Sequence, residues 1–224
     1  MKRSNCNLNQ IIRLIDIQLI PCLVATVMVA TSFINEHFVW WLIPCSRHRH
    51  SLQETIDTLA SRHDAVSFTP HITLGPPFAS SDDPPQLFSS TGGLVSISPS
   101  QMRVATGDRF TQCVFLRFDQ DIAGLEDLRQ QVLDVTGAAS DPDDRFPHLS
   151  LLYKQSLVET DANRIAESLS LEQLGVCDNP LVFDTLQLMR INLPVETNED
   201  VRKWECVETV RLLEKKRPTR KSRI

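Results

Sequence analysis

Hydrophobic runs and turn residues divide the middle of the chain into alternating strands and helices. The uninterrupted apolar run 38–43, FVWWLI, has the length and aromatic content of a buried strand, and it stops at Pro44. Ser51 and Glu54 then have the spacing of a helix-capping box, and apolar residues recur behind them at helical intervals. We therefore predict a strand over 38–43 and a helix over 51–62.

The same order recurs in the second half of the chain. The run 113–118, CVFLRF, predicts another apolar strand, and apolar residues at helical spacing over 122–135 predict a helix that ends at Gly137. The remaining predicted elements are strands over 94–97, 102–105, 181–191 and 203–213 and a helix over 158–169. The polar, proline-containing connection over 75–93 is the best boundary between two lobes.

Each of the two units ends in a strand that carries His-x-Thr/Ser-Leu. The segment 68–74 has the sequence FTPHITL, and the segment 145–151 has the sequence RFPHLSL. This internal repeat predicts an α+β fold of two lobes related by a pseudo-two-fold axis. Each lobe is expected to be a small, mainly antiparallel sheet with outer helices, and a central cleft is expected between the two sheets.

The repeated motif places an imidazole and a hydroxyl side by side on each strand. Residues i and i+2 of a strand face the same side, so His71 projects with Thr73, and His148 projects with Ser150. The apolar residues between and after them point to the helix-covered face. A single such motif usually belongs to packing or to the surface, but two copies on matching units favour a functional site.

Two imidazoles and two hydroxyls around one cleft suit in-line displacement at phosphorus. One neutral imidazole takes a proton from water, and the other, protonated, gives a proton to the departing oxygen. The hydroxyls stabilise the charge on the non-bridging oxygens. This chemistry requires neither a metal nor a cofactor, and we predict none. A strained cyclic phosphate is an apt substrate because opening its ring relieves the strain.

The paired HITL and HLSL motifs resemble the two signatures of the 2H phosphoesterase superfamily. Within it, the segments 41–44 (WLIP), 113–116 (CVFL) and 147–153 (PHLSLLY) are similar to the cyclic phosphodiesterase family of fungi and plants, over about 38–212. The resemblance implies hydrolysis of ADP-ribose 1″,2″-cyclic phosphate to the 1″-phosphate and of nucleoside 2′,3′-cyclic phosphates to 2′-phosphates. The first of these substrates is a by-product of tRNA splicing.

The resemblance also assigns roles to individual residues. The residues that match the family's catalytic positions are His71, Thr73, His148 and Ser150. Because the product keeps its 2′-phosphate, the resemblance makes His71 the base and His148 the acid; the sequence itself is symmetric on this point. His48 and His50 lie on a polar stretch, and we expect them to be solvated surface residues rather than metal ligands.

Three aromatic residues are candidates for substrate contact. Tyr153 matches an aromatic hydroxyl of the family, but it lies three residues after Ser150, so an ideal strand turns it to the opposite face. A bulge or a strand end must return it to the cleft; otherwise it is a core residue. Trp41 and Phe115 either offer a stacking surface to the substrate or belong to the core.

Composition limits the partners. The 224 residues are 42% hydrophobic and 23% charged, which is typical of a globular protein. Six cations lie in the last ten residues, so the remainder of the chain has a net charge of −11, against −5 for the whole. An acidic body does not coat nucleic acid, so we expect a small-molecule substrate and no stable nucleic-acid partner. We also expect a monomer. The alternatives are an RNA-end phosphodiesterase similar to 2′–5′ RNA ligase and a non-enzymatic nucleotide- or RNA-binding module.

The two ends lie outside the predicted bilobal domain, which spans 38–213. Residues 1–37 form a hydrophobic N-terminal segment that contains the apolar run 17–34. Three alternatives are open for this segment: an upstream extension of the gene model, a signal segment or a short membrane anchor. Membrane association is expected only through this run. The chain is predicted to be cytoplasmic, or Golgi-associated if the segment anchors it. The basic tail 214–224 is either a solvated terminus or an address for an anionic partner.

Overall fold

The computed structural model describes residues 36–79, 93–119, 122, 124–139 and 147–212. They belong to a unit that begins at Glu36. The predicted anchor run 17–34 and the basic tail 214–224 lie outside the described residues. Within the described part of the chain, every helix is too short or too polar to span a bilayer.

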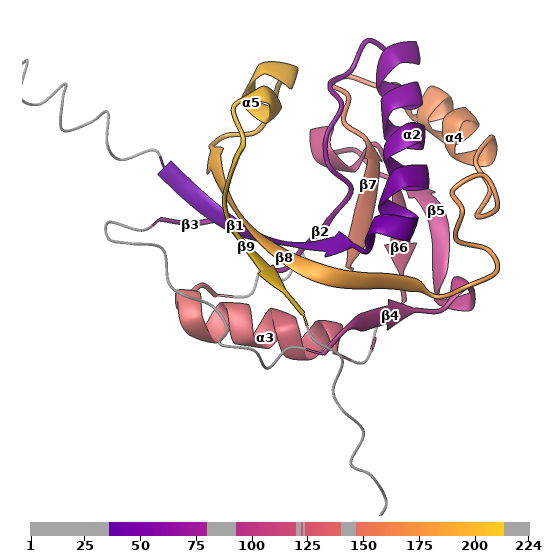
Figure 1. Ribbon diagram of the computed structural model, residues 1–224. Coiled ribbons are helices and arrows are strands. Elements are labelled where there is room, and N and C mark those ends of the chain that lie inside the picture. Colours follow the sequence, from indigo (N-terminus) through magenta and orange to yellow (C-terminus); the bar gives the residue numbers. More distant parts are fainter. Residues whose placement is uncertain (1–35, 80–92, 120–121, 123, 140–146, 213–224) are drawn as a thin grey trace, which may run out of the picture. The chain divides into compact units, whose positions relative to one another are not determined.

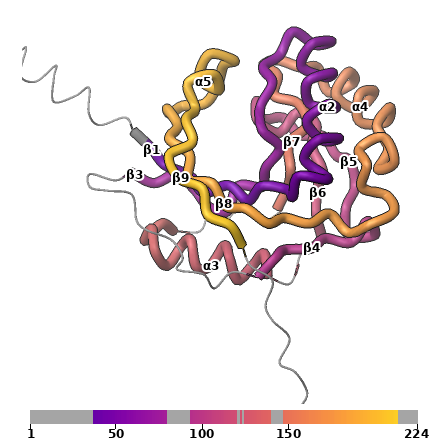
Figure 2. Tube along the Cα trace, viewed as in Figure 1, coloured from indigo at the N-terminus to yellow at the C-terminus, as the bar shows by residue number. Residues whose placement is uncertain are grey.

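Nine strands pair into one antiparallel sheet (Figure 1). They are β1 (Glu36–Pro44), β2 (Ile72–Thr73), β3 (Phe78–Ala79), β4 (Val95–Ile97), β5 (Met102–Thr106), β6 (Val114–Phe118), β7 (His148–Leu152), β8 (Leu181–Asn192) and β9 (Glu205–Arg211). Along the sheet the order is β4-β8-β1-β2-β7-β6-β5, with β3 added to β1 and β9 added to β8. Figure 2 shows β1 and β8, from opposite ends of the described chain, running side by side.

The described residues also form four α-helices and two short 3-10 turns. They are α2 (Ser46–Arg62), α3 (Leu125–Thr136), α4 (Glu159–Glu167), α5 (Asn198–Arg202) and the turns Pro99–Gln101 and Phe110–Gln112. Helix α2 packs against β1 and β7, and α4 packs against β5 and β6. The predicted repeat is present as β1-α2-β2 and β6-α3-β7, and the α+β class is confirmed.

The prediction of two separate sheets is wrong in one respect, because β2 joins the halves. Ile72 of β2 pairs with Leu149 of β7, so the two histidine motifs lie on neighbouring antiparallel strands rather than on facing sheets. Both residues are fully buried. Their backbone groups need hydrogen-bond partners in the core, and each strand supplies those of the other. Strand β2 is shorter than the predicted 68–74, in part because Pro70 has no N–H to extend the ladder.

Helix α2 begins five residues before the predicted capping box, and this corrects the expectation for His48. His48 lies one turn before Leu52 and two turns before Ile56, and all three side chains are buried. The Nδ1 atom of His48 accepts a hydrogen bond from the Val182 N–H at 3.2 Å, so this histidine serves the junction between helix and sheet. His50 is exposed, as predicted.

The alternation along β1 divides the core between the two faces of the sheet. Trp40 belongs to the large cluster between the sheet and its helices. Trp41 points to the other face, where it packs in a second cluster with Val39, Ile43 and Ile191. This second face carries the candidate site.

Candidate active site

A cavity of about 260 Å³ opens on this face of the sheet. Six of the seven predicted site residues line it, namely Trp41, His71, Thr73, His148, Ser150 and Tyr153. The strand alternation explains this grouping, because Ile72 and Leu149 turn into the core and leave their polar neighbours on the cavity side.

The imidazole of His71 is held in one tautomer. Its Nδ1 lies 2.6 Å from the Thr69 carbonyl oxygen. A carbonyl oxygen only accepts hydrogen bonds, so Nδ1 carries the proton and Nε2 keeps its lone pair. The pKa of His71 is lowered to about 3, mainly by burial; the Thr69 hydrogen bond opposes this shift, and the nearby charge of His148 contributes to it. The residue is therefore a neutral proton acceptor at neutral pH.

Trp41 covers one face of this imidazole. The two rings are stacked, with centroids 3.6 Å apart and an interplanar angle of 11°. That face of the indole is consequently occupied by the histidine and is closed to a substrate base.

His148 begins β7 and is half-exposed at the cavity. The Phe115 ring stands edge-on to it at a centroid distance of 5.4 Å. Phe115 is half-buried and is not among the residues that line the cavity. In this structure it therefore contacts a site residue and does not form part of the cavity wall.

The two hydroxyls of the repeated motif have different surroundings. Thr73 is half-buried at the cavity wall. Ser150 is only 4% exposed, and its hydroxyl donates a hydrogen bond of 2.6 Å to the Thr111 carbonyl oxygen. The single proton of the Ser150 hydroxyl is thus already engaged by a loop carbonyl.

A bulge in β7 brings Tyr153 to the cavity. Ser150 pairs with Phe115, whereas the next pair along β6 joins Val114 to Leu152, so Leu151 is an extra residue in β7. The bulge shifts the alternation by one residue, and Tyr153 lines the cavity just after the strand ends. Burial raises the pKa of its phenol, which stays protonated as a hydrogen-bond donor.

Several cavity residues were not predicted. Arg109 and Gln112 come from the turn before β6, and Arg109 is the one permanently charged side chain in the lining. Val195 and Trp204 come from the connection between β8 and β9. Trp204, an aromatic residue among charged neighbours inside the predicted strand 203–213, was a usable signal. Arg109 had none, since the place of its turn at the cavity depends on tertiary structure.

Two histidine motifs thus share one cavity on one face of the sheet. A family model described as the 2′-5′ RNA ligase superfamily matches residues 48–192. The chain belongs to this superfamily, that of the 2H phosphoesterases, and is an enzyme of it.

Individual relatives agree with this assignment. A cyclic phosphodiesterase from Arabidopsis thaliana is 26% identical over 176 residues, which cover 77% of this chain and 93% of the relative. Among solved structures, Escherichia coli LigT in its apo form has a TM-score of 0.51 at 11% identity and covers 81% of this chain and 99% of its own. A structure named as a phosphoesterase has a TM-score of 0.50 at 13% identity, with coverage of 80% and 99%. These structural matches show the fold.

Proposed function

We propose that the protein hydrolyses small cyclic phosphates, namely ADP-ribose 1″,2″-cyclic phosphate to the 1″-phosphate and nucleoside 2′,3′-cyclic phosphates to 2′-phosphates. The observation that carries the proposal is that both imidazoles open onto one cavity, with Nε2 of His71 fixed as a proton acceptor. The homologous cyclic phosphodiesterase supports the same reaction class.

The reaction adds water across one P–O bond of the ring. Nε2 of His71 takes a proton from water as its oxygen attacks phosphorus, and the bond to the 3′ oxygen breaks on the opposite side. His148 donates a proton to that oxygen, which leaves as a hydroxyl while the phosphate stays on the 2′ oxygen. Exchange of protons with solvent then restores both imidazoles. Acid and base are both imidazoles, so the reaction needs no metal.

Four groups of the lining stabilise the charge that builds on the non-bridging oxygens. They are the hydroxyls of Thr73 and Ser150, the phenol of Tyr153 and the guanidinium of Arg109. Donors that are already positioned are the most effective in the transition state, and Ser150 joins them only after its hydroxyl releases the Thr111 carbonyl.

The superfamily description favours one alternative, an RNA-end phosphodiesterase acting on polynucleotides. Such a substrate requires several phosphate contacts along a basic groove. The described cavity lining offers one permanent cation, Arg109. We therefore propose that the substrates are small molecules. We propose in addition that their source is tRNA splicing and that the protein works as a cytoplasmic monomer.

The central test is turnover of both small substrates in EDTA, with the product position determined by phosphorus NMR. We expect full activity in EDTA and 2′-phosphate products from the nucleotides. His71→Ala and His148→Ala should each lose several orders of magnitude in kcat, since each removes one of the two proton-transfer groups.

Exposed His50 provides the matched control, and His50→Ala should keep wild-type turnover. Near-wild-type turnover by either cavity variant contradicts the two-imidazole mechanism. Turnover of an RNA with a 2′,3′-cyclic end, but of neither small substrate, favours the polynucleotide alternative. Binding without turnover in every variant and in the wild type indicates a binding module.

A further inference from the structure

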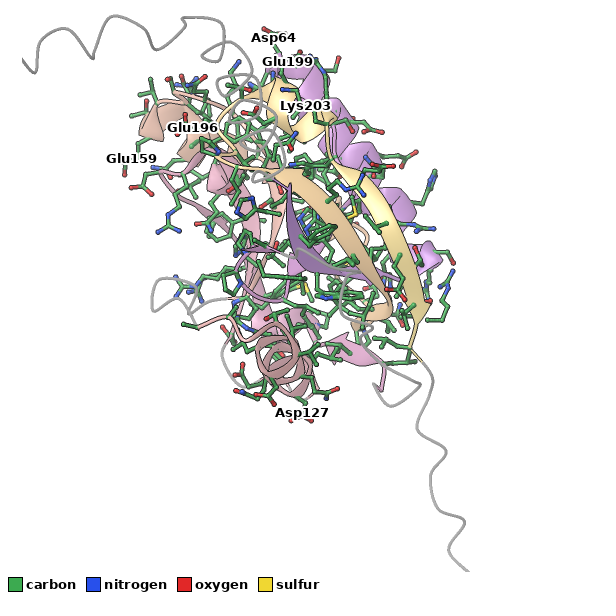
Figure 3. The ribbon with its side chains drawn as sticks, turned by 90° about the vertical axis from the view of Figure 1, so that its left-hand side faces the viewer. Asp64, Asp127, Glu159, Glu196, Glu199 and Lys203 are labelled. Atoms are coloured by element: carbon green, nitrogen blue, oxygen red, sulfur yellow. The ribbon has the colours of Figure 1, made fainter. Side chains whose placement is uncertain are left out.

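One tryptophan of the cavity comes from outside the two repeated units. Trp204 lies in residues 193–204, the connection between β8 and β9 that contains α5; we name this segment the arm. Figure 1 shows α5 standing apart from α2. At the outer end of the arm, Glu199 shares a second cavity with Asp64, which follows α2, and Figure 3 shows both labels at the same end of the molecule.

Trp204 contacts an aromatic ring on each side of the catalytic cavity. It stands edge-on to Trp41, with ring centroids 5.3 Å apart at 72°, and edge-on to Tyr153, at 6.0 Å and 77°. Such edge-to-face pairs are favoured arrangements that fix the relative position of two rings.

These contacts close a circuit of five rings around the site. From Trp204 the circuit runs through Trp41 to His71, with which Trp41 is stacked. The His71 ring lies edge-on to Phe68 at 6.3 Å, and Phe68 is stacked on Tyr153 at 3.7 Å. Tyr153 returns to Trp204, so every ring of the circuit contacts two others.

Among the described residues, Trp204 is also the one partly buried hydrophobic side chain that packs against both hydrophobic clusters. The larger cluster contains Phe68 and Tyr153, and the smaller one contains Trp41. Removing the indole therefore breaks the circuit and leaves His71 as the remaining link between Trp41 and the Phe68–Tyr153 stack.

We infer that Trp204 is a positioning residue, which holds the Trp41–His71 stack and the Tyr153 phenol in fixed relation across the cavity. This inference rests on the proposed function, because the groups it positions are the proposed base and a proposed phosphate donor. Misplacement of reacting groups by about 1 Å is enough to cost about 100-fold in rate.

A second effect follows from the burial of His71, which is the main cause of its lowered pKa. The titratable or charged groups that share the cavity with it are His148, Tyr153 and Arg109, and the arm adds none to the lining. Loss of the Trp204 indole admits water without changing these charges. The pKa of His71 should therefore rise toward its ordinary value.

The test compares Trp204→Ala and Trp204→Phe with a matched control, Trp40→Phe. Both indole N–H groups are buried without a partner among the described residues, but Trp40 lies on the core face, away from the cavity. We expect Trp204→Ala to lower kcat by about 10- to 100-fold with little change in KM. Trp204→Phe should restore most of kcat because it replaces a ring with a ring.

An NMR titration of the His71 imidazole gives a readout that is independent of turnover. Its midpoint should move upward in Trp204→Ala and stay unchanged in Trp40→Phe. The inference is overturned if Trp204→Ala keeps both the wild-type kcat and the wild-type titration midpoint of His71. It is also overturned if only the KM of this variant changes. If the wild type hydrolyses no cyclic phosphate, the proposed function fails, whereas the titration still decides the role of Trp204. If Trp204→Ala does not fold, Trp204→Leu decides it, because leucine removes the ring but fills part of its volume: a wild-type kcat with an unmoved midpoint in that variant leaves no positioning role.

Discussion

Equivalent residues of the repeat are not equivalent in the structure. The Ser150 hydroxyl donates to the Thr111 carbonyl, whereas Thr73 is half-exposed at the cavity wall. A hydroxyl has one proton to donate, so Ser150 must leave its carbonyl before it donates to a phosphate oxygen. The Ser150 hydroxyl therefore holds the turn that carries Thr111, and in the proposed mechanism Thr73 is the motif hydroxyl available to a phosphate oxygen.

This difference predicts unequal effects of removing the two hydroxyls. Thr73→Ala should lower kcat by about 10- to 1,000-fold, the range for one lost charge-stabilising donor. Ser150→Ala should lower kcat less and destabilise the fold more, because the Thr111 carbonyl loses its partner. Steady-state kinetics and urea unfolding of both variants measure the two effects. Thr73→Ser is the control that should recover activity; a larger kcat loss in Ser150→Ala than in Thr73→Ala contradicts the assignment.

At the same scale, the sequence predicted the histidine and hydroxyl positions because strand alternation is a local rule. The side to which Tyr153 points depends on the bulge at Leu151, and no local pattern marks that bulge. The stacking of Trp41 on His71 was also out of reach, since it depends on how β1 and β2 register.

Among the elements, α2 shows how a polar stretch enters the core. Its first turn carries His48, which is 4% exposed and accepts the N–H of Val182 at the start of β8. Burial, followed by the charge of Arg47, lowers the pKa of His48. In the unfolded chain the same imidazole binds a proton with its ordinary pKa of about 6.5.

The sign of the pH dependence follows from this comparison. Below about pH 6.5 the unfolded state binds more protons than the folded state, so stability rises with pH in that window and levels off above it. The contribution of His48 is complete above about pH 6.5 and is lost as the pH falls toward its lower folded pKa. The lowered pKa of His71 acts in the same direction.

Replacing His48 with Phe tests this account. His48→Phe leaves the buried Val182 N–H without a partner and should cost about 1–3 kcal/mol in unfolding free energy at pH 7.5. The cost should shrink at pH 5, where the wild type has lost part of the same contribution. Urea unfolding at the two pH values measures the difference. The control is His50→Gln, at an exposed ion pair with Glu54, which should change stability little at either pH. If the cost of His48→Phe is the same at both pH values, protonation of His48 is not coupled to folding.

Helices and strands were predicted well where the hydrophobic pattern repeats over many residues, and their first and last residues were predicted less well. The start of α2 was placed at the capping box, although the helix extends back through SRHRH because His48 continues its buried stripe. Helix α5 was not predicted, although Thr197 and Asp200 form a capping box that marks its start. Its five residues are too few for a helical period to show.

For the whole molecule, all described residues that line the cavity lie between Val39 and Trp204. The unit that begins at Glu36 therefore contains the complete described site. We predict that a chain lacking residues 1–35 keeps the kcat and KM of the full chain on 2′,3′-cyclic nucleotides. Parallel kinetic assays of the two chains check this prediction. A loss of kcat beyond about 10-fold would be comparable to the loss of a catalytic donor. Such a loss would assign the N-terminal segment a part in the site.

The backbone pairing that joins the two halves of the sheet also sets the distance between the two cavity histidines. Ile72 and Leu149 are the one registered pair between β2 and β7, and each is preceded directly by a histidine of the cavity. In the proposed mechanism, the distance between the proton acceptor and the proton donor is therefore set by one pair of backbone residues in the core of the sheet.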